Sequence, residues 1–150
     1  MRIAVIADTH NRLPFSVRAE ISAADEIWHL GDICNRETLD ELRGLGPPLH
    51  VIAGNCDPRG LAPETLSLER GGKTFFLVHE PLRTAPDGAD FLLHGHTHVP
   101  RDEMVGGTRF LNPGSVGKAN HGAGPSFAWL GIGPKGGITW KLVPVTRDRG

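Results

Sequence analysis

Seven side chains of metal-binding types stand at short polar breaks along this chain of 150 residues. They are two aspartates, one asparagine and four histidines, namely Asp8, His10, Asp32, Asn55, His79, His96 and His98. Carboxylate oxygen, amide oxygen and neutral imidazole together suit Mn, Fe, Co, Ni or Zn, and the set is too rich in nitrogen for Mg or Ca alone. Seven ligands are too many for a single tetrahedral metal site. They suit two ions about 3.5–4 Å apart that share a bridging carboxylate.

The front half of the sequence alternates apolar runs with short amphipathic segments. Strands are expected over Arg2–Ala7, Asp25–Leu30 and Leu49–Ala53, and helices from Pro14 to about Ala23 and over Arg36–Arg43. This alternation predicts parallel strands joined by right-handed crossovers. Ligand groups in such sheets gather outside the carboxyl ends of the strands, so we expect the polar breaks to meet at one edge.

The back half is rich in expected strands and poor in helix. The strands are expected over Glu64–Arg70, Lys73–His79, Asp90–His94, Arg101–Val105, Thr108–Leu111, Ser126–Ile132 and Ile138–Val145. A second sheet packed on the first is therefore predicted. The length is typical of one domain and no linker interrupts the chain, so residues 1–150 are expected to form a single domain.

The composition of the chain indicates which binding partners and which cellular location are expected. The formal net charge of −1 provides no broad basic groove, which argues against a polynucleotide substrate. No apolar run has the length of a signal peptide or a membrane span, so no membrane partner is expected. Cys34 and Cys56 are interpreted as ordinary reduced thiols, which are typical of a cytoplasmic protein.

The ordered blocks of the sequence resemble the signature of the calcineurin-like metallophosphoesterases. The blocks are Asp8-Thr9-His10, Gly31-Asp32, Gly54-Asn55-Cys56-Asp57, His79, Gly95-His96-Thr97-His98 and Asn112-Pro113-Gly114-Ser115. Within that superfamily the chain is similar to the small phosphodiesterase branch of the YfcE and MJ0936 type. The resemblance implies an α/β fold, a four-layer α-β-β-α sandwich of two mixed sheets flanked by helices. It also implies a dinuclear metal site at the C-terminal edge of the strands.

The resemblance further implies which side chains hold each ion. One ion would be held by Asp8, His10, Asp32 and His98, and the other by Asp32, Asn55, His79 and His96, with Asp32 bridging. The implied cofactors are two divalent ions, with Mn preferred and Fe, Ni, Co or Zn as alternatives. Asp32 and Asn55 would also be catalytic, and Asn55 would hydrogen-bond a substrate oxygen.

The implied activity is that of a metal-dependent phosphodiesterase. Small phosphodiesters would be hydrolysed by in-line attack of a metal-bridging hydroxide. The alternatives are a phosphomonoesterase acting on a small metabolite, or a catalytically weak scaffold of the same fold, as in the retromer subunit of this superfamily. Scaffold relatives lose ligand histidines, whereas every ligand position is filled here. The sequence leaves the physiological substrate and a homo-oligomeric state open.

Two departures from the family pattern affect the expected chemistry. Cys56 stands where many relatives carry a histidine that is proposed as the acid for the leaving group. A thiol is a weak donor, so we expect a preference for good leaving groups such as aryl diesters. The segment Glu80–Ala89, with Pro81, Pro86 and Gly88, replaces a longer helical segment of relatives, and a more open rim is expected.

Other residues received weaker assignments. His29, His50 and His94 are interpreted as structural, and His121 as a loop residue near the substrate or in solvent. Arg59 and Arg83 are weak candidates for contact with phosphate.

Overall fold

The apolar run at the N-terminus forms the central strand of a five-stranded sheet in the computed structural model, which describes residues 1–117 and 123–145. Strand β1 (Arg2–Ile6) pairs in parallel with β2 (Glu26–His29), which pairs in parallel with β3 (Leu49–Val51). On its other side β1 pairs antiparallel with β9 (Ser126–Ile132), and β10 (Ile138–Pro144) completes the sheet. Because β1, β2 and β3 run in parallel, their carboxyl ends meet at one edge.

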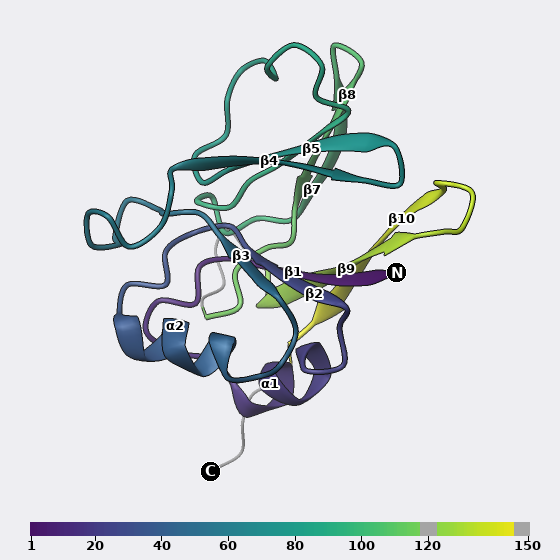
Figure 1. The fold of residues 1–150 in the computed structure, drawn as a ribbon. Helices are drawn as coiled ribbons and strands as arrows, with labels where there is room; N and C mark the ends of the chain where they lie inside the picture. Colours follow the sequence, from purple (N-terminus) through teal and green to yellow (C-terminus); the bar gives the residue numbers. More distant parts are fainter. Residues whose placement is uncertain (118–122, 146–150) are drawn as a thin grey trace.

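Two short helices cover the outer face of this sheet (Figure 1). Helix α1 (Phe15–Ile21) buries Val17 and Ile21, and helix α2 (Arg36–Arg43) buries Leu39 and Leu42. Asn35 caps α2, because its side-chain oxygen accepts a hydrogen bond from the Thr38 amide at 2.9 Å. Among the described residues, neither helix has the length and hydropathy needed to cross a bilayer.

The back half of the chain forms a second five-stranded sheet of mixed direction. Its strands are β4 (Thr65–Arg70), β5 (Lys73–Val78), β6 (Phe91–Leu93), β7 (Arg101–Val105) and β8 (Thr108–Asn112). The order across the sheet is β4-β5-β6-β8-β7, with β5, β6 and β8 parallel to one another. The carboxyl ends of β5 and β6 therefore also meet at a single edge.

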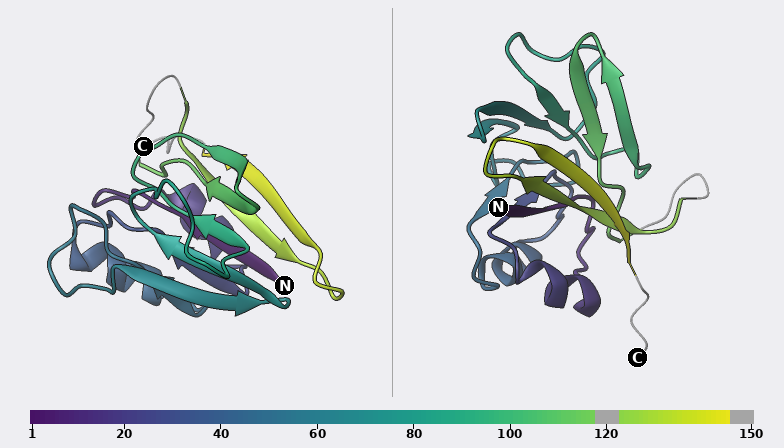
Figure 2. Two further views of the ribbon diagram at one scale, coloured as in Figure 1. Left: turned by 90° about the horizontal axis from the view of Figure 1, so that it is seen from above. Right: turned by 90° about the vertical axis from the view of Figure 1, so that its right-hand side faces the viewer.

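The main apolar core lies between the two sheets, which stack face to face (Figure 2). Aromatic rings fill its middle: Phe75 stacks on Phe91 with ring centroids 4.6 Å apart, and Trp28 meets Phe75 edge to face at 5.4 Å. These contacts join β2 to β5 and β6. The core thereby holds the strand ends of one sheet beside those of the other.

The predicted α/β class and the two mixed sheets are confirmed, and every predicted helix and strand is formed. The fourth layer differs from the family expectation. Within the described residues, no helix covers the outer face of the second sheet, so the layers number three (Figures 1 and 2). The segment between β5 and β6 forms no helix, because Pro81, Pro86 and Gly88 interrupt its short length.

Candidate metal centre

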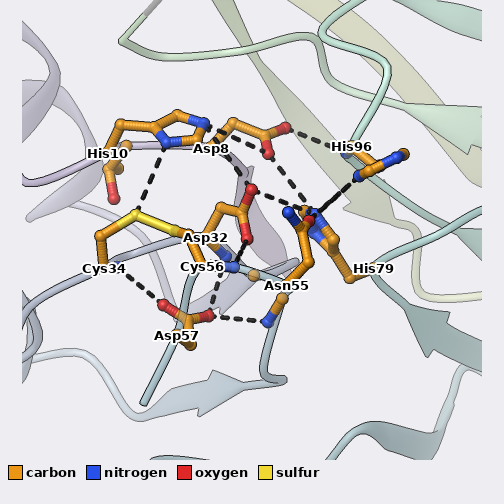
Figure 3. Close-up of a disulfide and its surroundings, with 12 residues drawn as sticks. Asp8, His10, Asp32, Cys34, Asn55, Cys56, Asp57, His79 and His96 are labelled. Atoms are coloured by element: carbon orange, nitrogen blue, oxygen red, sulfur yellow. Dashed lines mark hydrogen bonds and ion pairs between the residues drawn. A yellow bond between two sulfur atoms is a disulfide. The ribbon is translucent and has the colours of Figure 1, made fainter.

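Five loops bring the seven predicted side chains together where the carboxyl ends of the strands meet. Figure 3 labels all of them except His98. Asp8 and His10 follow β1, Asp32 follows β2 and Asn55 follows β3, all in the first sheet. The second sheet contributes His79 after β5, and His96 and His98 after β6.

One group of side chains surrounds the imidazoles of His10 and His98. Their Nε2 atoms lie 3.2 Å apart, and Asp8 Oδ1 lies 3.5 Å from Nε2 of His98. Asp32 Oδ2 lies 3.7 Å from Nε2 of His10. The first ligand set expected from the sequence thus forms one compact cluster.

A second group surrounds the amide oxygen of Asn55. Asn55 Oδ1 lies 3.0 Å from His79 Nε2 and 3.1 Å from His96 Nδ1. Asp32 Oδ2, which also faces His10, lies 3.3 Å from His79 Nε2. The geometry therefore places Asp32 between the two clusters, as a bridging carboxylate would require.

The hydrogen bond on the far side of His79 sets the state of its ring. Its Nδ1 lies 2.8 Å from the carbonyl oxygen of Leu30, which can only accept, so Nδ1 carries the hydrogen. In the neutral ring the lone pair of Nε2 then faces the oxygens of Asn55 and Asp32. Lone pairs that point at one another repel, and a cation between them removes the repulsion. This arrangement is typical of a histidine metal ligand.

Asp8 has a buried carboxylate oxygen that the protein leaves unsatisfied. Its side chain is fully buried, and Oδ2 accepts a hydrogen bond from the His96 amide at 3.2 Å. Oδ1 has no hydrogen-bond partner among the described residues. Burial, together with the nearby charge of Asp32, raises the pKa of Asp8 to about 8. The side chains present thus fit bound divalent cations, which would supply the missing positive charge.

The backbone at these loops is strained where the ligands stand. Five of the seven residues adopt positive φ angles, namely Asp8 (56°), His10 (47°), Asp32 (63°), His96 (69°) and His98 (63°). Residues other than glycine rarely adopt this conformation, and such strain gathers at functional sites. The surrounding contacts hold these residues in place at a cost in local energy.

Asp57 holds two of the ligand loops together, a role that was not assigned from the sequence. Its Oδ2 accepts hydrogen bonds from the amides of Asp32 at 2.9 Å and Gly54 at 2.7 Å. Its Oδ1 accepts one from the Cys34 amide at 2.7 Å. The position of Asp57 inside the Gly54-Asn55-Cys56-Asp57 block was the available signal, but its partners lie mainly on another loop.

The buried side chain of His29 contacts two of the loops that carry the candidate ligands. Its ring is fully buried, and Nδ1 accepts a hydrogen bond from the Gly31 amide at 3.0 Å. Nε2 therefore carries the hydrogen, and it lies 3.1 Å from the hydroxyl of Thr9. Burial lowers the pKa of His29 to about 3, so the ring is neutral. His29 thus links the loop after β1 to the loop after β2.

The two other histidines interpreted as structural also lie outside the clusters. His50 Nε2 lies 3.2 Å from Glu26 at the opposite end of the sheet. His94 is buried, and its Nε2 lies 3.2 Å from the guanidinium of Arg101. Burial lowers the pKa of His94 to about 4.

Residues 1–134 match the calcineurin-like phosphoesterase superfamily domain. The chain belongs to this superfamily. It is 33% identical over 132 residues to the probable metallophosphoesterase MJ0623 of Methanocaldococcus jannaschii. This match covers 77% of this chain and 68% of that protein. It is 24% identical over 139 residues to phosphodiesterase MJ0936 of the same organism, with 76% and 83% of the two chains covered.

Two solved structures share the fold. YfcE, a phosphoesterase from E. coli, superimposes with a TM-score of 0.77 at 22% identity, over 97% of this chain and 100% of that chain. Wild-type Vps29 from Entamoeba histolytica complexed with Zn²⁺ gives a TM-score of 0.75 at 26% identity, over 96% and 99% of the chains. Membership of this metal-using superfamily supports a phosphoric ester hydrolase.

A disulfide beside the metal centre corrects the expectation of two reduced thiols. Cys34 and Cys56 are bonded to each other, with their Cα atoms 5.3 Å apart (Figure 3). A disulfide sulfur carries no hydrogen, so Cys56 cannot take the place of the acidic histidine of other superfamily members. The expected preference for good leaving groups stays a prediction, because it rested on the lack of a strong acid at this position and a disulfide supplies none. The pairing depends on the approach of two loops, which the sequence spacing did not reveal.

A pocket of about 420 Å³ opens beside the second cluster. Asn55 and His79 are among its lining residues, together with Arg59 and Glu80. Arg59 is therefore placed where it can meet a substrate, whereas Arg83 is exposed and does not line this pocket. His121 lies outside the described residues.

Proposed function

We propose that this chain is a phosphodiesterase that hydrolyses small phosphodiesters with two divalent ions, as one domain over residues 1–150. The observation that carries the proposal is a pair of ligand clusters that share Asp32. The first ion would be held by Asp8, His10, Asp32 and His98, and the second by Asp32, Asn55, His79 and His96. Mn is the preferred metal, because the donors mix oxygen with several imidazole nitrogens.

Bound ions would supply an activated water and neutralise charge on the phosphoryl oxygens. The residues of the chain have separate tasks around them. Asp32 would contribute to both ion positions, and the hydrogen bond from His79 to Leu30 directs Nε2 of His79 toward Asp32. Asn55, which lines the pocket, is placed to orient a substrate oxygen.

The pocket supports a diester substrate over a monoester. It begins at Asn55 and His79 and extends to Arg59, so one organic arm of a diester would occupy it. The segment between β5 and β6 carries no helix, and the more open rim expected from it would admit the second arm of the diester. The Arg59 guanidinium is placed to attract the negative charge that a diester retains.

The cytoplasmic location expected from the sequence stays a prediction. The Cys34–Cys56 disulfide removes the argument from reduced cysteines.

The test uses the full chain, stripped of metal and reloaded with Mn²⁺. Bis(para-nitrophenyl) phosphate and para-nitrophenyl phosphate are compared as a diester and a monoester with the same leaving group. We expect kcat/KM for the diester to exceed that for the monoester by about tenfold or more, a difference of at least about 1.4 kcal/mol in the barriers.

Three outcomes separate the candidate functions. Faster cleavage of the monoester would favour the phosphomonoesterase alternative. A chain that binds both ions and cleaves neither ester would favour the scaffold alternative. Asp32→Asn, purified in the same way, serves as the control: activity that the natural chain shows and this variant lacks comes from the chain and not from a contaminating enzyme.

A further inference from the structure

We propose that the Cys34–Cys56 disulfide is a redox-sensitive positioning crosslink of the metal centre. While closed, it holds the loop that carries Asp32 against the loop that carries Asn55, and its reduction weakens metal binding. The inference rests on the proposed metal binding at this site. It adds control of the site by the thiol–disulfide state of the surroundings.

The position of the bond in the chain is the first observation. Cys34 lies two residues after Asp32, and Cys56 directly follows Asn55. The crosslink thus spans the loops after β2 and β3, each of which carries one proposed ligand close to its cysteine (Figure 3). Opening the bond leaves these ligand loops joined only through the intervening main chain and non-covalent contacts.

Both cysteines also take part, through their backbones, in holding the bridging carboxylate. The Cys56 amide donates to Asp32 Oδ1 at 3.0 Å, which orients Oδ2 toward the two clusters. The Cys34 amide donates to Asp57, whose carboxylate also accepts from the Asp32 amide. Movement of either cysteine is therefore transmitted directly to Asp32.

A third contact reaches His10. Cys34 Sγ lies 3.5 Å from Nδ1 of His10. Because a disulfide sulfur has no hydrogen to donate, His10 is the donor in this contact, and the lone pair of Nε2 then faces Asp8 and Asp32. A free Cys34 thiol can instead donate to Nδ1, which favours the tautomer with its hydrogen on Nε2. In that tautomer the hydrogen must leave Nε2 before this nitrogen can bind a metal, which weakens binding.

The bond is placed where a reductant can reach it. Neither cysteine is buried, and Asn55 and Asp57 on either side of Cys56 line the open pocket. A small dithiol would attack one sulfur as its thiolate, break the S–S bond and then close to its own disulfide. Its two hydrogens would end on Cys34 and Cys56. A disulfide reagent such as oxidised glutathione would reverse the reaction.

The test measures metal affinity rather than activity. Metal-free protein is divided into an untreated sample and one reduced with a phosphine, which takes up oxygen from water as the two cysteines gain hydrogens. After anaerobic removal of the phosphine, free Mn²⁺ is titrated by electron paramagnetic resonance. We expect the dissociation constant for Mn²⁺ to rise about tenfold on reduction, as loss of supporting contacts around ligands typically causes. Reoxidation with oxidised glutathione should restore the original value.

The double variant Cys34→Ser/Cys56→Ser is the matched control. It should bind Mn²⁺ like the reduced protein and show no response to the phosphine. Circular dichroism of each form checks that the fold is kept, and if the double variant fails to fold, the reversible change in the natural chain still decides. Equal or tighter binding after reduction would overturn the crosslink proposal and leave the proposed function intact. Absence of Mn²⁺ binding in both forms would overturn both.

Discussion

Two buried carboxylates at opposite ends of neighbouring strands have opposite electrostatic environments. Glu26 begins β2, and the guanidinium of Arg70 donates to its Oε2 and Oε1 at 2.7 Å each. Asp8 follows β1 and has one oxygen without a hydrogen-bond partner in the described part of the chain. The pKa of Glu26 is lowered, chiefly by the hydrogen bonds from Arg70, whereas burial raises that of Asp8 to about 8.

The difference separates a structural carboxylate from one arranged for an added cation. Glu26 receives its positive partner from the chain itself, so its end of the sheet is complete once folded. Asp8 lies beside the like charge of Asp32, with imidazoles whose ring nitrogens approach within hydrogen-bonding range of other ligands. A buried charge without a partner is costly, and a cation from solution would remove this cost.

Asp32→Asn should have the largest effect, because Asp32 lies between the two clusters. We expect kcat/KM to fall on the order of a thousandfold, equivalent to about 4 kcal/mol, with loss of at least one bound ion. Phosphodiester hydrolysis and elemental analysis measure the two effects. Asp40→Asn, an exposed aspartate on α2, is the matched control and should leave both unchanged. An Asp32→Asn variant that keeps both ions and most activity would contradict the bridging assignment.

Arg70→Met would leave Glu26, like Asp8, as a buried carboxylate without a positively charged partner from the chain. The variant leaves a buried carboxylate without its main partner, so the free energy of unfolding should fall by about 3 kcal/mol. Urea unfolding measures this change. Mn²⁺ affinity should stay unchanged, because Glu26 begins β2 whereas the ligands follow its other end. A loss of metal binding in the folded variant would show that the two ends are coupled.

Asp8→Asn tests the opposite case. In metal-free protein at neutral pH it should raise the free energy of unfolding by about 1–3 kcal/mol, because the folded chain keeps Asp8 protonated at a pH where the unfolded chain has lost that proton, and asparagine carries no such cost. The Asn oxygen can keep the hydrogen bond from the His96 amide while the new NH2 replaces the unpaired oxygen. With Mn²⁺ present, the stabilisation given by metal should be reduced. Thermal unfolding with and without Mn²⁺ measures both, and a less stable metal-free variant would contradict this account.

The pH dependence of the same variant provides a second check. Because the pKa of Asp8 is raised from 3.8 to about 8, the folded metal-free chain holds a proton that the unfolded chain has lost between these values. The contribution of Asp8 to the free energy of unfolding therefore falls as pH rises through this range. Asp8→Asn should remove this slope. Glu26 has the opposite sign, since its lowered pKa stabilises the fold at neutral pH and this contribution is lost in acid.

Arg109→Met should have the smallest effect and serves as the exposed counterpart of Arg70→Met. Arg109 donates to both oxygens of Asp102 at 2.8 Å, but nearly half of the Asp102 side chain (48%) is exposed to solvent. We expect a loss below about 1 kcal/mol in urea unfolding. If this variant costs as much as Arg70→Met, burial is not what makes the Glu26 pair important.

The sequence by itself determined the elements and the types of side chain at the site. The run Arg2–Ile6 and the helix Arg36–Arg43 are encoded by close neighbours, through apolar continuity in one case and an asparagine cap in the other. Ordered blocks of metal-binding residues after successive strands predicted one polar edge, because parallel strands end together. The positions of these blocks along the chain were therefore enough to predict that Asp8, Asp32 and Asn55 lie at the same edge of the sheet.

Only the tertiary structure decided which groups at that edge form hydrogen bonds or a disulfide with one another, and which polar atom stays without a partner. The disulfide of Cys34 and Cys56, the three amides held by Asp57 and the unpaired oxygen of Asp8 all depend on loops far apart in the chain. The shape of the pocket likewise follows from segments after β3 and β5 that meet only in the folded protein. Residue types and spacing specify local conformation, whereas contact distances and burial arise only when both sheets pack on a common core.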